Sequence, residues 1–190
     1  VIDGWSDPNY AGTPVVELNG GNLGTLVKGL YLGSTSTGST IRGLIVNRFT
    51  GTGIEINGSN NQTIQGNWIG LNSTGSAASA NGVKGIFGQN STGNLIGGTT
   101  AAARNVISGN TEQGIYFDNV DNSTIAGNYI GTNVSGTGDV TGTGANTLQS
   151  GVFLTNGSSG NVIGTNLDGN NDAAERNVIS GNNHYGFEVL

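Results

Sequence analysis

The chain lacks several residue types that would support common functions. Its 190 residues include no cysteine, no methionine and only two prolines, and just 9% are charged. Without cysteine there is no disulfide framework, no thiolate metal site and no cysteine nucleophile. Six basic residues and a net charge of −6 leave few groups for phosphates, so we expect no nucleic-acid partner. No apolar run approaches the roughly 20 residues of a membrane-spanning helix, so we expect no membrane insertion in this segment.

Small polar and turn-forming residues dominate what is present. Gly, Asn, Thr and Ser account for 100 of the 190 residues. Such bias is often typical of disorder, but Ile, Val, Leu and Phe contribute 46 residues, roughly 24% of the chain and above the range associated with disorder. Long runs of helix formers are absent, which excludes a helical bundle and disfavours a doubly wound α/β fold. The composition therefore indicates a folded chain with a thin apolar core.

Two internal repeats organise the sequence. Residues 45–75 match residues 106–136 at 12 of 31 positions without gaps. The segment 101–110, Ala-Ala-Ala-Arg-Asn-Val-Ile-Ser-Gly-Asn, recurs at 173–182 with nine of ten residues identical. Compositional bias alone would not place Arg104 and Arg176 in matching contexts, because the chain has only six basic residues.

A finer repeat of three short apolar segments lies within these units. An Asn-x-Ile type, a Gly-Ile type and a type ending in Ile recur in that order, and Val46 to Ile69 and Ile107 to Ile130 are both steps of 23 residues. The steps from Ile69 to Ile107 and from Ile130 to Ile179 are longer, because they contain extra polar stretches. Three short strands per turn of about 23 residues, with loop insertions, predict an all-β parallel β-helix, although a β-sandwich is an alternative. Stacked coils would align one side-chain ladder: Asn67, Asn105, Asn128 and Asn177.

We expect one domain over residues 1–190, with an opening coil or cap region at 1–43 and repeating coils at 44–190. The chain starts at Val1 and ends in the strand-like segment 187–190. These features suggest a fragment of a longer polypeptide.

Several segments carry a resemblance to a known group. Residues 97–110, residues 127–132 and the opening Ile2-Asp3-Gly4 resemble bacterial right-handed parallel β-helix repeat proteins, which have a pectate-lyase-like solenoid fold. The resemblance covers nearly the whole chain. It implies a right-handed parallel β-helix and a secreted or cell-surface location. It implies no single activity, because this fold carries lyases, hydrolases, epimerases, adhesins and passive stalks.

Acidic residues are too sparse to predict a catalytic centre. A glycosidase needs two carboxylates about 5–10 Å apart. Asp118 and Asp121 align with Asn57 and Asn60 under the repeat offset of 61, so no acidic column forms. We therefore assign no catalytic residue and expect no required cofactor.

One loop has the oxygen side chains of a candidate calcium site. Ca²⁺ binds six to eight hard oxygen ligands from a flexible loop. An alternative is an Asx-rich turn, in which these side chains bond only to their own backbone. The candidate ligands are Asn166, Asp168, Asn170, Asp172 and Glu175.

A second candidate site follows from strand alternation. The residue after each inward residue of the Gly-Ile strands should point outward, which gives a column of three aromatics between two carboxylates. Such a strip could bind a polysaccharide or glycan, with rings on sugar faces and carboxylates on hydroxyls. Alternatively, it is a structural aromatic stack covered by the loop 132–149. The column comprises Glu55, Phe87, Tyr116, Phe153 and Glu188.

These observations lead to two functional hypotheses. The first is a non-enzymatic extracellular structural or adhesive module of a larger surface or secreted protein. The second is a carbohydrate-binding or polysaccharide-active β-helix. In either case, open coil ends and strand edges could support end-to-end or lateral self-association.

Overall fold

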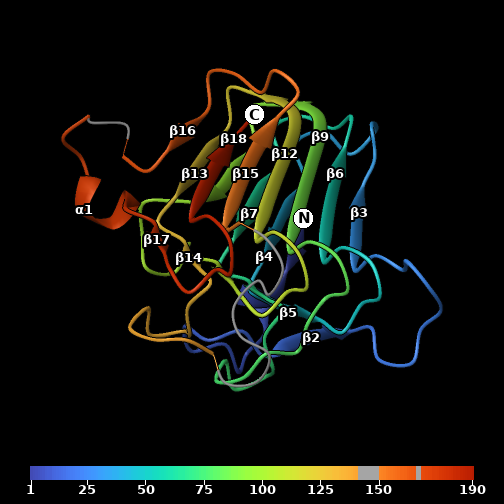
Figure 1. Cartoon of the computed structure of the whole chain (residues 1–190). Coiled ribbons are helices and arrows are strands. Elements are labelled where there is room, and N and C mark those ends of the chain that lie inside the picture. Colours follow the sequence, from blue (N-terminus) through green and yellow to red (C-terminus); the bar gives the residue numbers. More distant parts are fainter. Residues whose placement is uncertain (141–149, 166–167) are drawn as a thin grey trace.

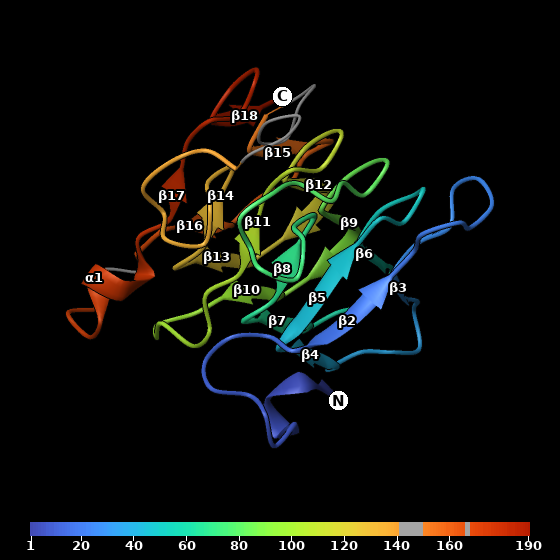
Figure 2. The same cartoon turned by 90° about the horizontal axis from the view of Figure 1, so that it is seen from below.

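The computed structural model describes residues 1–140, 150–165 and 168–190. These residues form a right-handed parallel β-helix in which three parallel sheets of six strands surround a narrow interior (Figure 1). Each coil gives one strand to each sheet, and six coils stack in chain order from the blue N-terminal end to the red C-terminal end (Figure 2). The fold class expected from the repeats is therefore confirmed.

The three sheets are named A, B and C in the order in which each coil enters them. Sheet A contains β1 (Ile2–Asp3), β4 (Thr40–Arg42), β7 (Thr63–Gln65), β10 (Leu95–Gly97), β13 (Thr124–Ala126) and β16 (Val162–Ile163). Sheet B contains β2 (Val16–Asn19), β5 (Leu44–Asn47), β8 (Trp68–Ile69), β11 (Val106–Ile107), β14 (Tyr129–Ile130) and β17 (Val178–Ile179). Sheet C contains β3 (Leu30–Leu32), β6 (Ile54–Asn57), β9 (Ile86–Thr92), β12 (Ile115–Asp121), β15 (Val152–Thr155) and β18 (Phe187–Val189).

Two short helices lie outside the sheets. The 3-10 helix η1 (Gly4–Ser6) follows β1, and α1 (Asp172–Glu175) precedes β17. Figure 1 shows α1 projecting from the stack beside β16 and β17. No helix in the described part of the chain has the length and apolarity needed to cross a membrane.

The core is a column of aliphatic side chains along the axis. In sheet A, Ile41, Ile64, Ile96 and Ile125 occupy equivalent register positions and are buried. Sheets B and C add similar columns, so all three faces contribute to one continuous cluster. Some strands bury more than one core residue, such as Ile115 and Phe117 of β12, and this cluster provides most of the apolar burial.

The predicted asparagine ladder is present at the corner between sheets A and B. Each carboxamide nitrogen donates to the carboxamide oxygen on the next coil, at 3.1 Å for Asn67 to Asn105, 3.0 Å for Asn105 to Asn128 and 3.1 Å for Asn128 to Asn177. The corresponding sequence steps are 38, 23 and 49 residues. Loop insertions therefore change coil length without disturbing the ladder.

The other two corners carry polar ladders that the sequence reading missed. Between sheets C and A, the backbone N–H of each ladder residue donates to the side chain on the next coil, from Gln62 to Asn94, from Asn94 to Ser123 and from Ser123 to Asn161. Between sheets B and C, the Asn81 carboxamide donates to that of Asn110 at 2.9 Å. The corners are thus held by side chains as well as by strand pairing.

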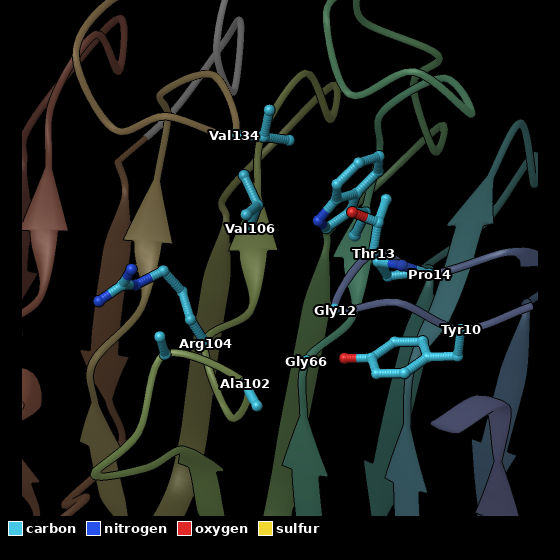
Figure 3. Close-up of a pocket in the computed structure, with 11 residues that line it drawn as sticks. Tyr10, Gly12, Thr13, Pro14, Gly66, Ala102, Arg104, Val106 and Val134 are labelled. Atoms are coloured by element: carbon cyan, nitrogen blue, oxygen red, sulfur yellow. The ribbon is translucent and has the colours of Figure 1, made fainter. Parts of the chain in front are cut away.

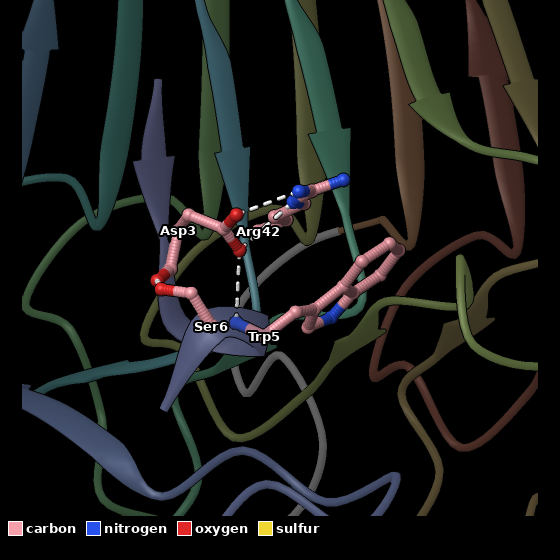
Figure 4. Close-up of polar contacts among 4 residues, drawn as sticks. All are labelled: Asp3, Trp5, Ser6 and Arg42. Atoms are coloured by element: carbon pink, nitrogen blue, oxygen red, sulfur yellow. Dashed lines mark hydrogen bonds and ion pairs between the residues drawn. The ribbon is translucent and has the colours of Figure 1, made fainter. Parts of the chain in front are cut away.

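The opening region 1–43 supplies the first coil and β4 of the second coil. Asp3 anchors the N-terminal segment to β4. Its carboxylate accepts hydrogen bonds from the Arg42 guanidinium and from the Trp5 backbone N–H (Figure 4). The Arg42 guanidinium also lies 4.6 Å from the Trp5 ring centre. The hydrogen bonds from Arg42 hold the pKa of the Asp3 carboxyl below its usual value.

Candidate functional site

The outer face of sheet C carries the predicted column in register. Glu55 pairs with Phe87, Phe87 with Tyr116, Tyr116 with Phe153, and Phe153 with Glu188. The column begins one coil earlier than we expected, because Tyr31 pairs with Glu55. The repeated Gly-apolar-x pattern was sufficient to find this alignment, since it fixes both the register and the face.

The three aromatic rings stack along the axis. The ring centres of Phe87 and Tyr116 are 5.2 Å apart with planes inclined by 30°, and those of Tyr116 and Phe153 are 4.9 Å apart with planes inclined by 18°. All three side chains are partly buried. In this geometry the ring faces cover one another and the ring edges face outward. The stack therefore stabilises neighbouring coils and leaves few free ring faces for a sugar.

A lysine lies over the stack. The Lys84 ammonium is 5.3 Å from the Phe87 ring centre and 5.0 Å from that of Tyr116, and it pairs with Glu112 at 2.9 Å. Burial, followed by the negative charges of Asp118 and Glu112, raises the pKa of the Tyr116 hydroxyl. The Tyr116 hydroxyl can act as a hydrogen-bond donor.

The two carboxylates at the ends of the column have local partners. Glu55 was expected to be exposed, but it is only 4% exposed because Lys28 lies over it and pairs with it at 2.7 Å. Glu188 accepts a hydrogen bond of 2.5 Å from the Ser150 hydroxyl. The expected cover from the loop 132–149 involves residues 141–149, which lie outside the described residues.

Lys28 and Lys84 were not found by the sequence reading. Both immediately precede the glycine of a Gly-apolar strand start, in Lys28-Gly29-Leu30 and Lys84-Gly85-Ile86. This recurring dipeptide is the signal that could have placed a cation beside the column. The carboxylate that each lysine binds could not be read from it, because the partners come from neighbouring coils.

A polar row runs beside the aromatic column. Asn57 pairs with Gln89, Gln89 with Asp118 and Asp118 with Thr155. Asp118 accepts from the Asn156 side chain at 2.8 Å, and Asp121 accepts from the Ser159 hydroxyl at 2.8 Å. The cross-strand partners of Asp118 are thus neutral, as expected from the sequence.

The candidate calcium loop is only partly described. Asn166 lies outside the described residues, and Asp168 and Asn170 are exposed. The backbone N–H of Asn170 donates to Asp168 Oδ1 at 2.7 Å, which is the hydrogen bond of an Asx turn. Asp172 begins α1, and Glu175 is buried in a cavity that Gln65 and Thr124 also line.

The loop does not gather its carboxylates around one point. Within residues 1–140, 150–165 and 168–190, no group of three or more His, Asp or Glu side chains could hold a metal ion. The Asx turn is therefore present, while calcium binding that also uses amide oxygens stays a prediction.

A second apolar cluster covers the outer face of sheet B. Leu71, Val106 and Val140 are buried there, and Trp68 and Tyr129 pack against them. The aromatic residues of this sheet alternate with valines along the register, as Trp68 pairs with Val106 and Val106 with Tyr129. Their role in this cluster is structural.

The fold and surface described above define a parallel β-helix solenoid with an aromatic column on the outer face of sheet C. Comparison with protein-family models, curated proteins and solved structures found no match for this chain.

Proposed function

We propose that this chain is a non-enzymatic structural module, a rigid spacer within a larger extracellular or cell-surface protein. The proposal rests on the observation that most of its carboxylates bond to a neighbouring coil. Seven of them bond to a side chain on an adjacent coil: Asp3, Glu17, Glu55, Glu112, Asp118, Asp121 and Glu188. These carboxylates link neighbouring coils to one another.

Carboxylates that link neighbouring coils favour a rigid structural role over a catalytic one. In the described residues, the acids of sheet C bond to a lysine, asparagine or serine on a neighbouring coil. Together with the three corner ladders, these bonds couple each coil to its neighbours. A solenoid whose coils are coupled in this way resists bending and local opening.

The location is part of the proposal. The resemblance of residues 97–110 and 127–132 to bacterial β-helix repeat proteins, which are secreted or surface-bound, supports an extracellular or cell-surface setting. End-to-end association is a further proposal.

Single-molecule pulling tests the spacer function. The wild-type module should resist force until whole coils unfold together. A Lys28→Met and Lys84→Met double variant should unfold at a higher rate, because it loses two coil-to-coil pairs and leaves Glu55 buried without its cation. Arg48→Met is the matched control, because Arg48 is exposed and forms no ion pair among the described residues.

Carbohydrate binding is the second candidate function. It is favoured by the polar row beside the aromatic column on sheet C, because amide and hydroxyl groups at coil spacing match sugar hydroxyls. A glycan array with wild type, Tyr116→Ala and Tyr185→Ala separates the two functions. Tyr185 is an exposed aromatic in the last coil and serves as the control. A glycan retained by wild type and Tyr185→Ala but lost in Tyr116→Ala would overturn the passive-spacer proposal.

A further inference from the structure

Two arginines of the repeated ten-residue segment line one groove on sheet B. Arg104 and Arg176 face it together with Tyr129, Asn177 and Val178, and its volume is about 350 Å³. Neither arginine has a role in the spacer proposal.

The register explains why the two guanidinium groups share this groove. Asn105, Asn128 and Asn177 form one ladder, so the residues before them, Arg104, Gly127 and Arg176, occupy equivalent positions on three successive coils. The middle position is Gly127, so no third side chain stands between the two arginines. Two coil spacings separate their backbones by roughly 10 Å, which flexible arginine side chains can span together.

Arg104 is held in place from two sides. Its Nε donates to the Gly127 carbonyl at 3.0 Å, and its guanidinium lies 4.2 Å from the Tyr129 ring centre. In Figure 3 the guanidinium points away from Tyr10 and Gly66. The contact with the Tyr129 ring orients the Arg104 guanidinium and leaves its terminal nitrogens as donors.

The charges of these arginines are not balanced by ion pairs. Lys28, Arg42 and Lys84 each pair with a carboxylate, whereas no ion pair with Arg104 or Arg176 occurs in the described part of the chain. Arg176 is exposed, and its Nε donates to the Ala173 carbonyl at 3.1 Å.

The nearby acids do not fill the groove. Glu175 is buried and lines a different cavity, on the sheet A side of α1. Asp172, four residues before Arg176, forms no ion pair with it. Two cations therefore concentrate in one groove of a protein whose net charge is −6.

We propose that Arg104 and Arg176 form an oxyanion-binding site, which takes a sulfate, phosphate or carboxylate group in the groove that Tyr129 also lines. Guanidinium groups bind such anions through paired charge-assisted hydrogen bonds. The shared ligand chemistry is the oxyanion, whether it is free or attached to a polysaccharide. The site is independent of the spacer proposal, which uses sheet C and the coil-to-coil pairs.

Titration with sodium sulfate, followed by the Arg Nε signals in NMR spectra, tests the site. Sulfate should shift the Arg104 and Arg176 signals in a saturable way. Arg104→Ala and Arg176→Ala should each weaken binding about tenfold or more, because each removes charge-assisted hydrogen bonds. Arg176→Lys should show a smaller loss, because it keeps the charge without the planar donor pair.

Arg48→Ala is the charge-matched control, because it removes one exposed cation outside the groove. Arg176→Ala is the variant expected to fold normally, since its side chain is exposed. Dextran sulfate, polygalacturonate and neutral dextran then show whether the oxyanion is accepted on a sulfated or carboxylated polymer. The proposal is overturned if sulfate binding survives in the Arg104→Ala and Arg176→Ala double variant. It is also overturned if Arg48→Ala weakens binding equally.

Discussion

Asparagine and glycine alternate at one corner position between sheets C and A. Asn61, Gly93, Asn122 and Gly160 all have positive φ, at 56°, 69°, 48° and 64°. A Cβ added at Gly93 would overlap Asn61 Oδ1, and one added at Gly160 would overlap Asn122 Oδ1. Each asparagine side chain thus lies over the glycine of the next coil. The position has left-handed backbone in these four coils, and a side chain in place of Gly93 or Gly160 would displace the asparagine of the preceding coil.

Gly93→Ala tests this packing constraint. It should destabilise the protein by about 2 kcal/mol, because the left-handed backbone penalty adds to the displacement of the Asn61 side chain. Gly157→Ala is the matched control, since Gly157 also has positive φ (77°) but a Cβ there meets no atom within 4 Å. It should cost only about 1 kcal/mol. Urea denaturation measures both, and equal losses would contradict the packing account.

Strand alternation predicted the sheet C column but not the surroundings of its residues. Positive φ at Asn and Gly follows from their conformational freedom, and period-two alternation follows from strand geometry. The burial of Glu55 was missed because Lys28, which covers it, belongs to the previous coil. Such contacts depend on how loops of unequal length fold back, which the local pattern does not encode.

At the scale of elements, the corner ladders supply buried hydrogen bonds between coils whose strands are very short. Strands such as β8, β11 and β14 have only two residues each. Asn105, which immediately precedes β11, is fully buried and makes four side-chain hydrogen bonds. The sequence predicted this ladder because Asn recurs in an Asn-x-Ile frame. It missed the corner between sheets C and A because Gln62, Asn94, Ser123 and Asn161 differ in type while filling the same role.

Asn105→Ala measures the strength of the ladder. It should destabilise the fold by about 2–4 kcal/mol, because it leaves the Asn67 backbone N–H and the Ile64 carbonyl without their buried partner. Asn177→Ala should cost less, since Asn177 is only partly buried and water can replace its side chain. Thermal and urea denaturation of both variants give the comparison. A larger loss for Asn177→Ala would show that the ladder does not depend on burial.

At the scale of the whole molecule, stability should vary along the axis. A solenoid coil contacts only its neighbours, so its stability depends on its own burial and on the interfaces that it makes. In the middle coils, Ile86 and Ile115 are fully buried. In the last described coil, Phe187 and Val189 are 44% and 58% exposed.

Hydrogen exchange of this 190-residue chain should therefore report a gradient. Amides of β9 and β12 should exchange only through global unfolding, because both strands are paired on both sides. Amides of β15 that pair with β18 should exchange at least about 30-fold faster, since opening β18 exposes little new apolar surface and costs about 2 kcal/mol less. Peptide-resolved exchange at neutral pH measures this difference. Equal protection of β12 and β15 would mean that the coils unfold as one unit, with axial coupling stronger than the burial of any single coil.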